Sequence, residues 1–137
     1  MASKKIMIID DEPDVTTYLS AILKSNGYES FQVRDISKAM DIVHEVSPDL
    51  ICLDIMMPGE TGISFYIKLR QDKKFEDIPV IIISGVIESD KFNFRTYVTD
   101  KNIQAPQYYM EKPINVERYI EHVKQLTQKR NDIELRN

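Results

Sequence analysis

The sequence predicts an α/β protein, with helices on both faces of a doubly wound parallel sheet. Short apolar runs rich in β-branched residues alternate with segments whose apolar residues recur at helical spacing, and this alternation is typical of consecutive βαβ units. Residues 80–83, Val-Ile-Ile-Ile, are the clearest run and indicate a central strand that is buried on both faces. The 137 residues, of which 42% are hydrophobic, are enough for one domain and too few for two ordinary ones.

Two βα units are expected in the first part of the chain. Residues 6–9 form an apolar run, and a helix follows with Pro13 in its first turn and Gly27 at its exit. Residues 28–33 alternate weakly between apolar and polar, as expected for a second strand. Apolar residues at helical spacing then predict a second helix, which ends before Pro48.

The remaining elements continue the same alternation with one interruption. Residues 50–53 predict a third strand, and a loop at 56–61 leads into a third helix. After the β-branched run, residues 108–110 predict a short fifth strand, and Asn115 is suited to cap a last helix.

The interruption is the stretch at 88–107, where aromatic residues are scattered among charged ones. We expect one helix of two or three turns there, followed by a long connection. From Thr127 onward the chain is mostly polar and charged. The predicted domain therefore covers 1–126, and 127–137 is a charged helix extension or a linker.

The composition argues against several classes of protein. The formal net charge of -4 gives no general attraction to nucleic acid or to an anionic membrane. Cys52 is the only cysteine, so no disulfide framework is expected. No apolar run approaches the roughly 18 residues of a membrane span. We expect a soluble, cytoplasmic protein with no direct nucleic-acid or membrane partner.

Polar side chains stand at the ends of four predicted strands. Asp10 and Asp11 follow the first strand, Asp54 the third, Ser84 the fourth and Lys112 the fifth. Each alone is more commonly a helix cap, a turn residue or a solvated side chain. Together they are informative, because ligands of open parallel sheets bind in the crevice outside the carboxyl ends of the strands. With the strand order 2-1-3-4-5, Asp11 and Asp54 lie on neighbouring strands across that crevice.

Three carboxylates in one pocket repel one another and favour a bound cation. The ligand atoms are all oxygen, which favours a hard ion, with Mg²⁺ ahead of Mn²⁺. Such an ion, the Lys112 ammonium and the Ser84 hydroxyl can each neutralise one oxygen of a phosphoryl group. Asp54 is then the nucleophile, and its product is an acyl phosphate.

Four stretches of the sequence match a known family. They are IMIIDDEPD at 6–14, PDLICLDIMMPGETG at 48–62, VIIISG at 80–85 and YYMEKP at 108–113. On these residues the sequence resembles the receiver domains of two-component response regulators, over about residues 4 to 126. The resemblance implies a flavodoxin-like (βα)5 sheet with strand order 2-1-3-4-5.

The resemblance also implies a set of metal ligands. Asp54 falls on the phosphoacceptor position, which also contributes to the metal site. Asp11 falls on the direct metal ligand, and Asp10 on a residue that acts through water. The backbone carbonyl of Met56 would complete the protein's share of the ligands.

The remaining roles implied by the resemblance concern the switch. Ser84 matches the switch hydroxyl, Lys112 the lysine that pairs with phosphate, and Tyr109 the aromatic residue that turns inward when the hydroxyl moves. The implied function is a phosphoacceptor switch of a phosphorelay, which takes a phosphoryl group from a histidine kinase or a histidine phosphotransfer protein. Such a protein catalyses only its own phosphorylation and dephosphorylation. It acts as a monomer or a phosphorylation-dependent dimer on a downstream effector or output domain that the sequence does not identify.

Two other functions compete with this interpretation. The stretch between Ser84 and Lys112 is longer than the family pattern, and Asn102 to Gln107 replaces the usual Gly-Ala turn. A receiver-like module that binds partners without phosphorylation is therefore one alternative. A phosphatase of the haloacid dehalogenase type is the other, although it needs a second Asp two positions after the nucleophile, where this chain has Met56.

Overall fold

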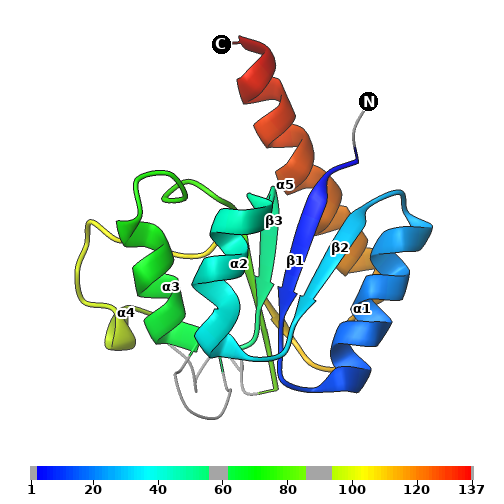
Figure 1. Ribbon diagram of the computed structural model, residues 1–137, viewed down its shortest axis with the longest axis horizontal. Helices are drawn as coiled ribbons and strands as arrows, with labels where there is room; N and C mark the ends of the chain where they lie inside the picture. The colour runs from blue at the N-terminus through cyan, green and yellow to red at the C-terminus, as the bar shows by residue number, and fades with distance from the viewer. Residues whose placement is uncertain (1–2, 56–61, 86–93, 137) are drawn as a thin grey trace.

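The predicted parallel sheet is present, with the strand order β2-β1-β3-β4-β5 (Figure 1). The computed structural model describes residues 3–55, 62–85 and 94–136. All four strand pairings are parallel. The strands are β1 (Lys5–Ile9), β2 (Glu29–Val33), β3 (Leu50–Leu53), β4 (Val80–Ser84) and β5 (Tyr108–Glu111).

The helices cover both faces of the sheet, as expected for a doubly wound fold. One face packs against α1 and α5, and the other against α2, α3 and α4 (Figure 1). The central strands β3 and β4 are buried along their whole length. The helices are α1 (Pro13–Ser25), α2 (Ala39–Val46), α3 (Gly62–Gln71), α4 (Phe94–Tyr97) and α5 (Val116–Arg136), and a short 3-10 turn (Ile36–Lys38) precedes α2.

Local sequence signals explain where several helices begin and end. Pro13 occupies the first turn of α1, where its missing N–H is not needed. Gly27 follows α1 with a φ of 87°, a left-handed conformation that glycine adopts without steric cost. The side chain of Asn115 accepts a hydrogen bond of 3.0 Å from the Arg118 N–H and so caps α5 as predicted.

The stretch that interrupted the sequence pattern follows an irregular path. Its described part begins with α4, which is a single turn, and continues as a connection to β5. Phe94, Val98 and Ile103 of this part are buried in the same core cluster as α2 and α3. The first part of the stretch for which a helix of two or three turns was predicted, 88–93, lies outside the described residues.

The backbone of α5 continues as a helix to Arg136 and extends beyond the sheet (Figure 1). Residues 127–136 are therefore helical in the structure. The domain boundary at 126 stays a prediction. Within the described ranges, no helix has both the length and the apolar character needed to cross a membrane.

Candidate functional site

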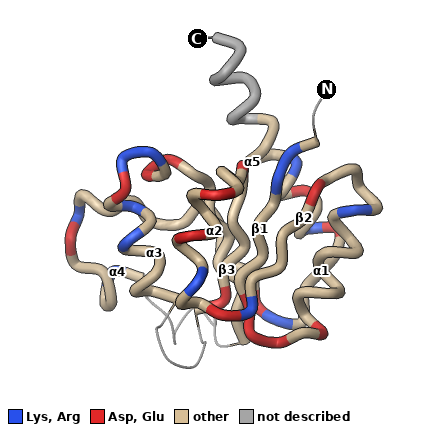
Figure 2. The backbone as a smooth tube through the Cα atoms, viewed as in Figure 1, with Lys and Arg blue, Asp and Glu red and all other residues tan. Residues whose placement is uncertain are grey.

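The carboxyl ends of the strands hold the predicted residues in a fixed relation through backbone hydrogen bonds. The Asp54 N–H donates to the carbonyl of Ile9 at 2.9 Å, and the Lys112 N–H donates to the carbonyl of Ser84 at 3.0 Å. The parallel ladder thus continues past the strand ends and sets the register of the side chains that follow. Figure 2 shows acidic and basic segments meeting at this lower edge of the sheet.

Lys112 contacts three carboxylates at once. Its Nζ lies 2.8 Å from Oδ2 of Asp10, 2.9 Å from Oε1 of Glu12 and 3.3 Å from Oδ2 of Asp54. The side chains of Asp10 and Asp54 are each only 3% exposed. Burial by itself would lower the pKa of Lys112, but the hydrogen bonds to Asp10 and Glu12 and the charge of Asp54 outweigh it and raise the pKa. The lysine is therefore a permanent cation at neutral pH.

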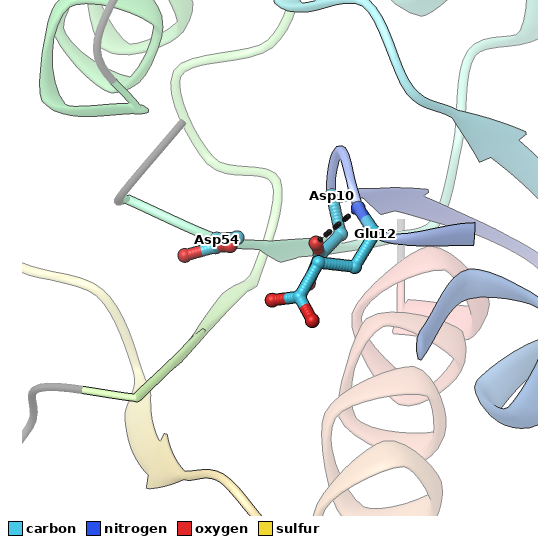
Figure 3. A group of neighbouring side chains, drawn as sticks. All are labelled: Asp10, Glu12 and Asp54. Atoms are coloured by element: carbon cyan, nitrogen blue, oxygen red, sulfur yellow. Dashed lines mark hydrogen bonds between the residues drawn. The ribbon is translucent and has the colours of Figure 1, made fainter. Parts of the chain in front are cut away.

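The carboxylates themselves form a compact group. Asp10, Glu12 and Asp54 can each offer one oxygen such that all three oxygens lie within 4.8 Å of one another (Figure 3). The turn after β1 is ordered by a hydrogen bond of 2.9 Å from the Glu12 N–H to Oδ1 of Asp10. Asp10 and Asp54 are buried and Glu12 is exposed, so Glu12 lies on the side of the group that faces solvent.

Glu12 is the residue that the sequence reasoning missed. The available signal was the run of three acids, Asp10, Asp11 and Glu12, directly before Pro13. Among the described residues, the group that could hold an ion contains Glu12 and not Asp11. The predicted role of Asp11 as the direct metal ligand stays a prediction. Met56, whose backbone carbonyl was also expected to bind the ion, lies outside the described residues.

Ser84 ends β4 beside this group. It is completely buried, and its register partner on β5 is Glu111, the residue before Lys112. Within the described part of the chain, its Oγ has no hydrogen-bond partner. A buried hydroxyl without a partner is uncommon, so this atom is available to a group that enters the site.

Gly62 brings the start of α3 directly against the site. A Cβ at this position would lie 2.6 Å from the carbonyl oxygen of Asp54 and 2.6 Å from the Cα of Ile55. Both are backbone atoms, which cannot move aside as a flexible side chain can. Only glycine therefore allows α3 to begin this close to Asp54.

Tyr109 lies on β5, one residue from Met110, which packs on the opposite face with α1 and α5. Its side chain is therefore on the face of α3 and α4. Burial and the nearby Tyr66 raise the pKa of Tyr109 to about 12, with Arg95 acting in the opposite direction. The role of Tyr109 as a switch residue stays a prediction.

The sequence matches the model of a known protein family. The model of the response regulator receiver domain matches residues 6–124, which is most of the chain. The chain belongs to this family. It is a receiver domain of the response regulator type, as the sequence resemblance predicted.

This receiver domain covers only part of some relatives and nearly the whole length of others. It is 34% identical over 90 residues to the phosphate regulon transcriptional regulatory protein PhoB of Pseudomonas aeruginosa, an alignment that covers 66% of this chain and 39% of PhoB. It is 29% identical over 123 residues to the polar-differentiation response regulator DivK of Brucella ovis, covering 89% of this chain and 94% of DivK. The chain thus spans less than two thirds of PhoB and nearly all of DivK.

A solved structure supports the same assignment. The response regulator TrrA of Thermotoga maritima, in complex with Mg(2+)-BeF, is similar with a TM-score of 0.72 and 29% identity. The match covers 90% of this receiver domain and 98% of the TrrA chain.

Proposed function

We propose that this receiver domain is a phosphoacceptor switch in which Asp54 accepts a phosphoryl group from a phosphohistidine. The observation that carries the proposal is the contact of Lys112 with Asp10, Glu12 and Asp54 at 2.8–3.3 Å. A buried carboxylate beside a fixed ammonium can act as a nucleophile toward phosphorus, because the charge that develops on the phosphoryl oxygens is neutralised.

The residues present fit a hard divalent cation. The three carboxylates supply only oxygen ligands, and the Oγ of Ser84, which has no hydrogen-bond partner in the described part of the chain, adds a polar atom at the same strand edge. Mg²⁺ is the best match, with Mn²⁺ as the alternative, because Mg²⁺ is commonly held by one or two carboxylates and the phosphate of the substrate. When bound, the ion would neutralise charge on the carboxylates and the phosphoryl oxygens. The proposed direct ligands are Asp11, Asp54 and the Met56 carbonyl, and Asp10 would act through water.

The residues of the chain have separate parts in the transfer. One carboxylate oxygen of Asp54 forms the new O–P bond while the N–P bond of the phosphohistidine breaks, and the imidazole nitrogen leaves with the electron pair. Lys112 stays protonated and contacts one phosphoryl oxygen, and the Ser84 hydroxyl contacts another. Tyr109 responds to the movement of that hydroxyl. The protein would act only on itself and not on a pool of substrates.

The donor would be a histidine kinase or a histidine phosphotransfer protein. The phosphoryl group changes the partner surface of the domain, which acts as a monomer or a phosphorylation-dependent dimer on an effector or output domain. We place the protein in the cytoplasm, where such donors present their phosphohistidine, and assign it no direct contact with nucleic acid.

Intact-mass spectrometry after incubation with Mg²⁺ and acetyl phosphate tests the proposal. One phosphoryl adduct is expected, and Asp54→Asn should abolish it. Asp41→Asn, which changes an exposed carboxylate in α2, is the matched control and should leave the adduct unchanged. An adduct that persists in Asp54→Asn would refute the assignment. So would the absence of any adduct on the wild type, from acetyl phosphate and from a purified histidine kinase alike.

A further inference from the structure

One face of α3 runs from the candidate phosphorylation site to the irregular segment 94–107. Gly62, Tyr66 and Arg70 are spaced four residues apart and so share this face of the helix. All three are buried. Gly62 touches the backbone of Asp54, and the two following positions contact segments that lie far away in the sequence.

Tyr66 holds the connection between α4 and β5. Its hydroxyl donates a hydrogen bond to the carbonyl oxygen of Gln104 and accepts one of 2.8 Å from Nε of Arg70. Its ring meets Phe94 edge-on with centroids 5.3 Å apart. Burial raises the pKa of Tyr66 although Arg70 opposes the shift, so the phenol stays protonated and able to donate. A single completely buried side chain thus contacts both ends of the irregular segment.

Arg70 fixes the position of Tyr66. The guanidinium lies 4.8 Å above the centre of the Tyr66 ring. Its Nη1 donates to the carbonyls of Glu76 and Ile78 at 3.0 and 2.6 Å. These bonds tie α3 to the chain that enters β4. Tyr66 is therefore held on one side by rigid structure, while on the other side it holds a connection that lacks regular structure.

The segment has room to change position. A cavity of about 160 Å³ lies beside it, lined by Arg70, Glu76, Asp77, Asn102 and Gln104. Within the described residues, Nη2 of Arg70 is buried without a hydrogen-bond partner. A buried N–H without a partner costs free energy.

We propose that the hydrogen bond between Tyr66 and Gln104 transmits the state of Asp54 to the segment 94–107. The coupling would run through the face of α3. Because Gly62 has no free space toward Asp54, a rearrangement at Asp54 displaces the start of α3 away from the sheet and carries Tyr66 off Gln104. The segment, with the exposed Tyr97, is then free to take a different position and so changes the surface next to β5. The coupling to phosphorylation rests on the proposed function, whereas the contact itself does not.

Hydrogen exchange of the segment tests the contact without phosphorylation. The amides of Val98, Asn102 and Ile103 are natural probes, because each donates a hydrogen bond within the segment. Tyr66→Phe removes one hydroxyl, and these amides should exchange about fivefold faster, the change expected for loss of one hydrogen bond. Unchanged exchange in a folded Tyr66→Phe protein would overturn the proposal.

Tyr119→Phe is the matched control. Tyr119 is also completely buried, but it packs on the other face of the sheet, where its hydroxyl lies 3.2 Å from Sγ of Cys52. Its replacement should leave exchange of the segment unchanged. Faster exchange of these amides in both variants would show a general loss of stability and would also overturn the proposal.

The same measurement with Mg²⁺ and acetyl phosphate tests the coupling. Phosphorylation of the wild type should speed exchange of the three amides, and Tyr66→Phe should abolish the difference while it still forms the Asp54 adduct. An adduct on the wild type with unchanged exchange overturns the coupling. Absence of an adduct in every protein refutes the proposed function and with it the coupling, while the comparison without phosphorylation still decides the role of Tyr66.

Discussion

Replacement of Lys112 by Met is expected to destabilise the receiver domain by about 3 kcal/mol at neutral pH. Methionine keeps a side chain of similar length and removes the charge. In the wild type, the Lys112 ammonium lies 2.8 Å from Asp10 and 3.3 Å from Asp54, and both carboxylates are almost completely buried. The Lys112 ammonium is thus in direct contact with two buried negative charges.

The magnitude follows from this burial. Removing one partner of a buried charge pair costs about 3–5 kcal/mol, because the remaining charge is left without compensation. The lower end of this range applies, since the Lys112 side chain is still 17% exposed to solvent. Glu12, at 59% exposure, adds less than about 1 kcal/mol, as for other surface ion pairs.

Urea unfolding without divalent ions measures this cost, and Lys124→Met is the control because it removes an exposed lysine from α5. Mg²⁺ should then stabilise Lys112→Met more than the wild type, because the ion no longer competes with an ammonium. A ligand that binds only the folded state at 100 times its Kd adds about 2.7 kcal/mol, which would restore most of the loss. Equal stability of Lys112→Met and the wild type without Mg²⁺ would refute the reasoning.

Three further predictions concern the same site. The pKa of Lys112 is raised on folding, so its contribution to the free energy of unfolding is fully present below about pH 10, the ordinary value for lysine, and decreases as the pH rises through the raised value. The difference in free energy of unfolding between the wild type and Lys112→Met should therefore stay constant between about pH 7 and 9. A difference that falls in this range would contradict the sign. Gly62→Ala should lower the free energy of unfolding in urea by about 3 kcal/mol, because the new Cβ would meet backbone atoms at 2.6 Å. Gly85→Ala is the control: a Cβ there has no neighbour within 4 Å and should change stability by no more than about 0.5 kcal/mol. Equal effects of the two substitutions would contradict the close approach of α3. Ser84→Ala should leave stability equal or increase it by about 1 kcal/mol, since it removes a buried hydroxyl without a partner among the described residues. The same substitution should slow formation of the acyl phosphate at Asp54 at least about tenfold in a mass-spectrometric time course. An unchanged rate would show that Ser84 takes no part in the transfer.

Most strands and helices could be predicted because they depend on patterns within single elements, whereas the strand order was implied by the resemblance to receiver domains. The run at 80–83 has β-branched residues at every position, and it forms the central strand β4, which is buried on both faces. Pro13 and Gly27 mark the two ends of α1. In each case a residue acts on its own backbone, so the signal is present in the local sequence.

Much of the site could be predicted for a related reason. Asp10, Asp54 and Lys112 converge because parallel strands share one carboxyl edge, which is a property of the topology and not of the individual side chains. The choice between Asp11 and Glu12 depends on how the turn after β1 directs two neighbouring side chains. Spacing in the sequence does not contain that information, because both residues directly follow the same strand.

The segment 94–107 could not be predicted because it is held by tertiary contacts. Phe94 and Val98 are four residues apart, as in a helix, but the next buried residue, Ile103, follows after five, and no periodic pattern covers all three. Tertiary contacts hold the segment instead: these three residues pack in the core, and Gln104 accepts a hydrogen bond from the hydroxyl of Tyr66, 38 positions away in the sequence. The chemistry of Asp54 depends on the strand ends, whereas the path of the segment depends on α3. Substitutions at Tyr66 are therefore expected to change the response of this receiver domain and to leave its phosphorylation intact.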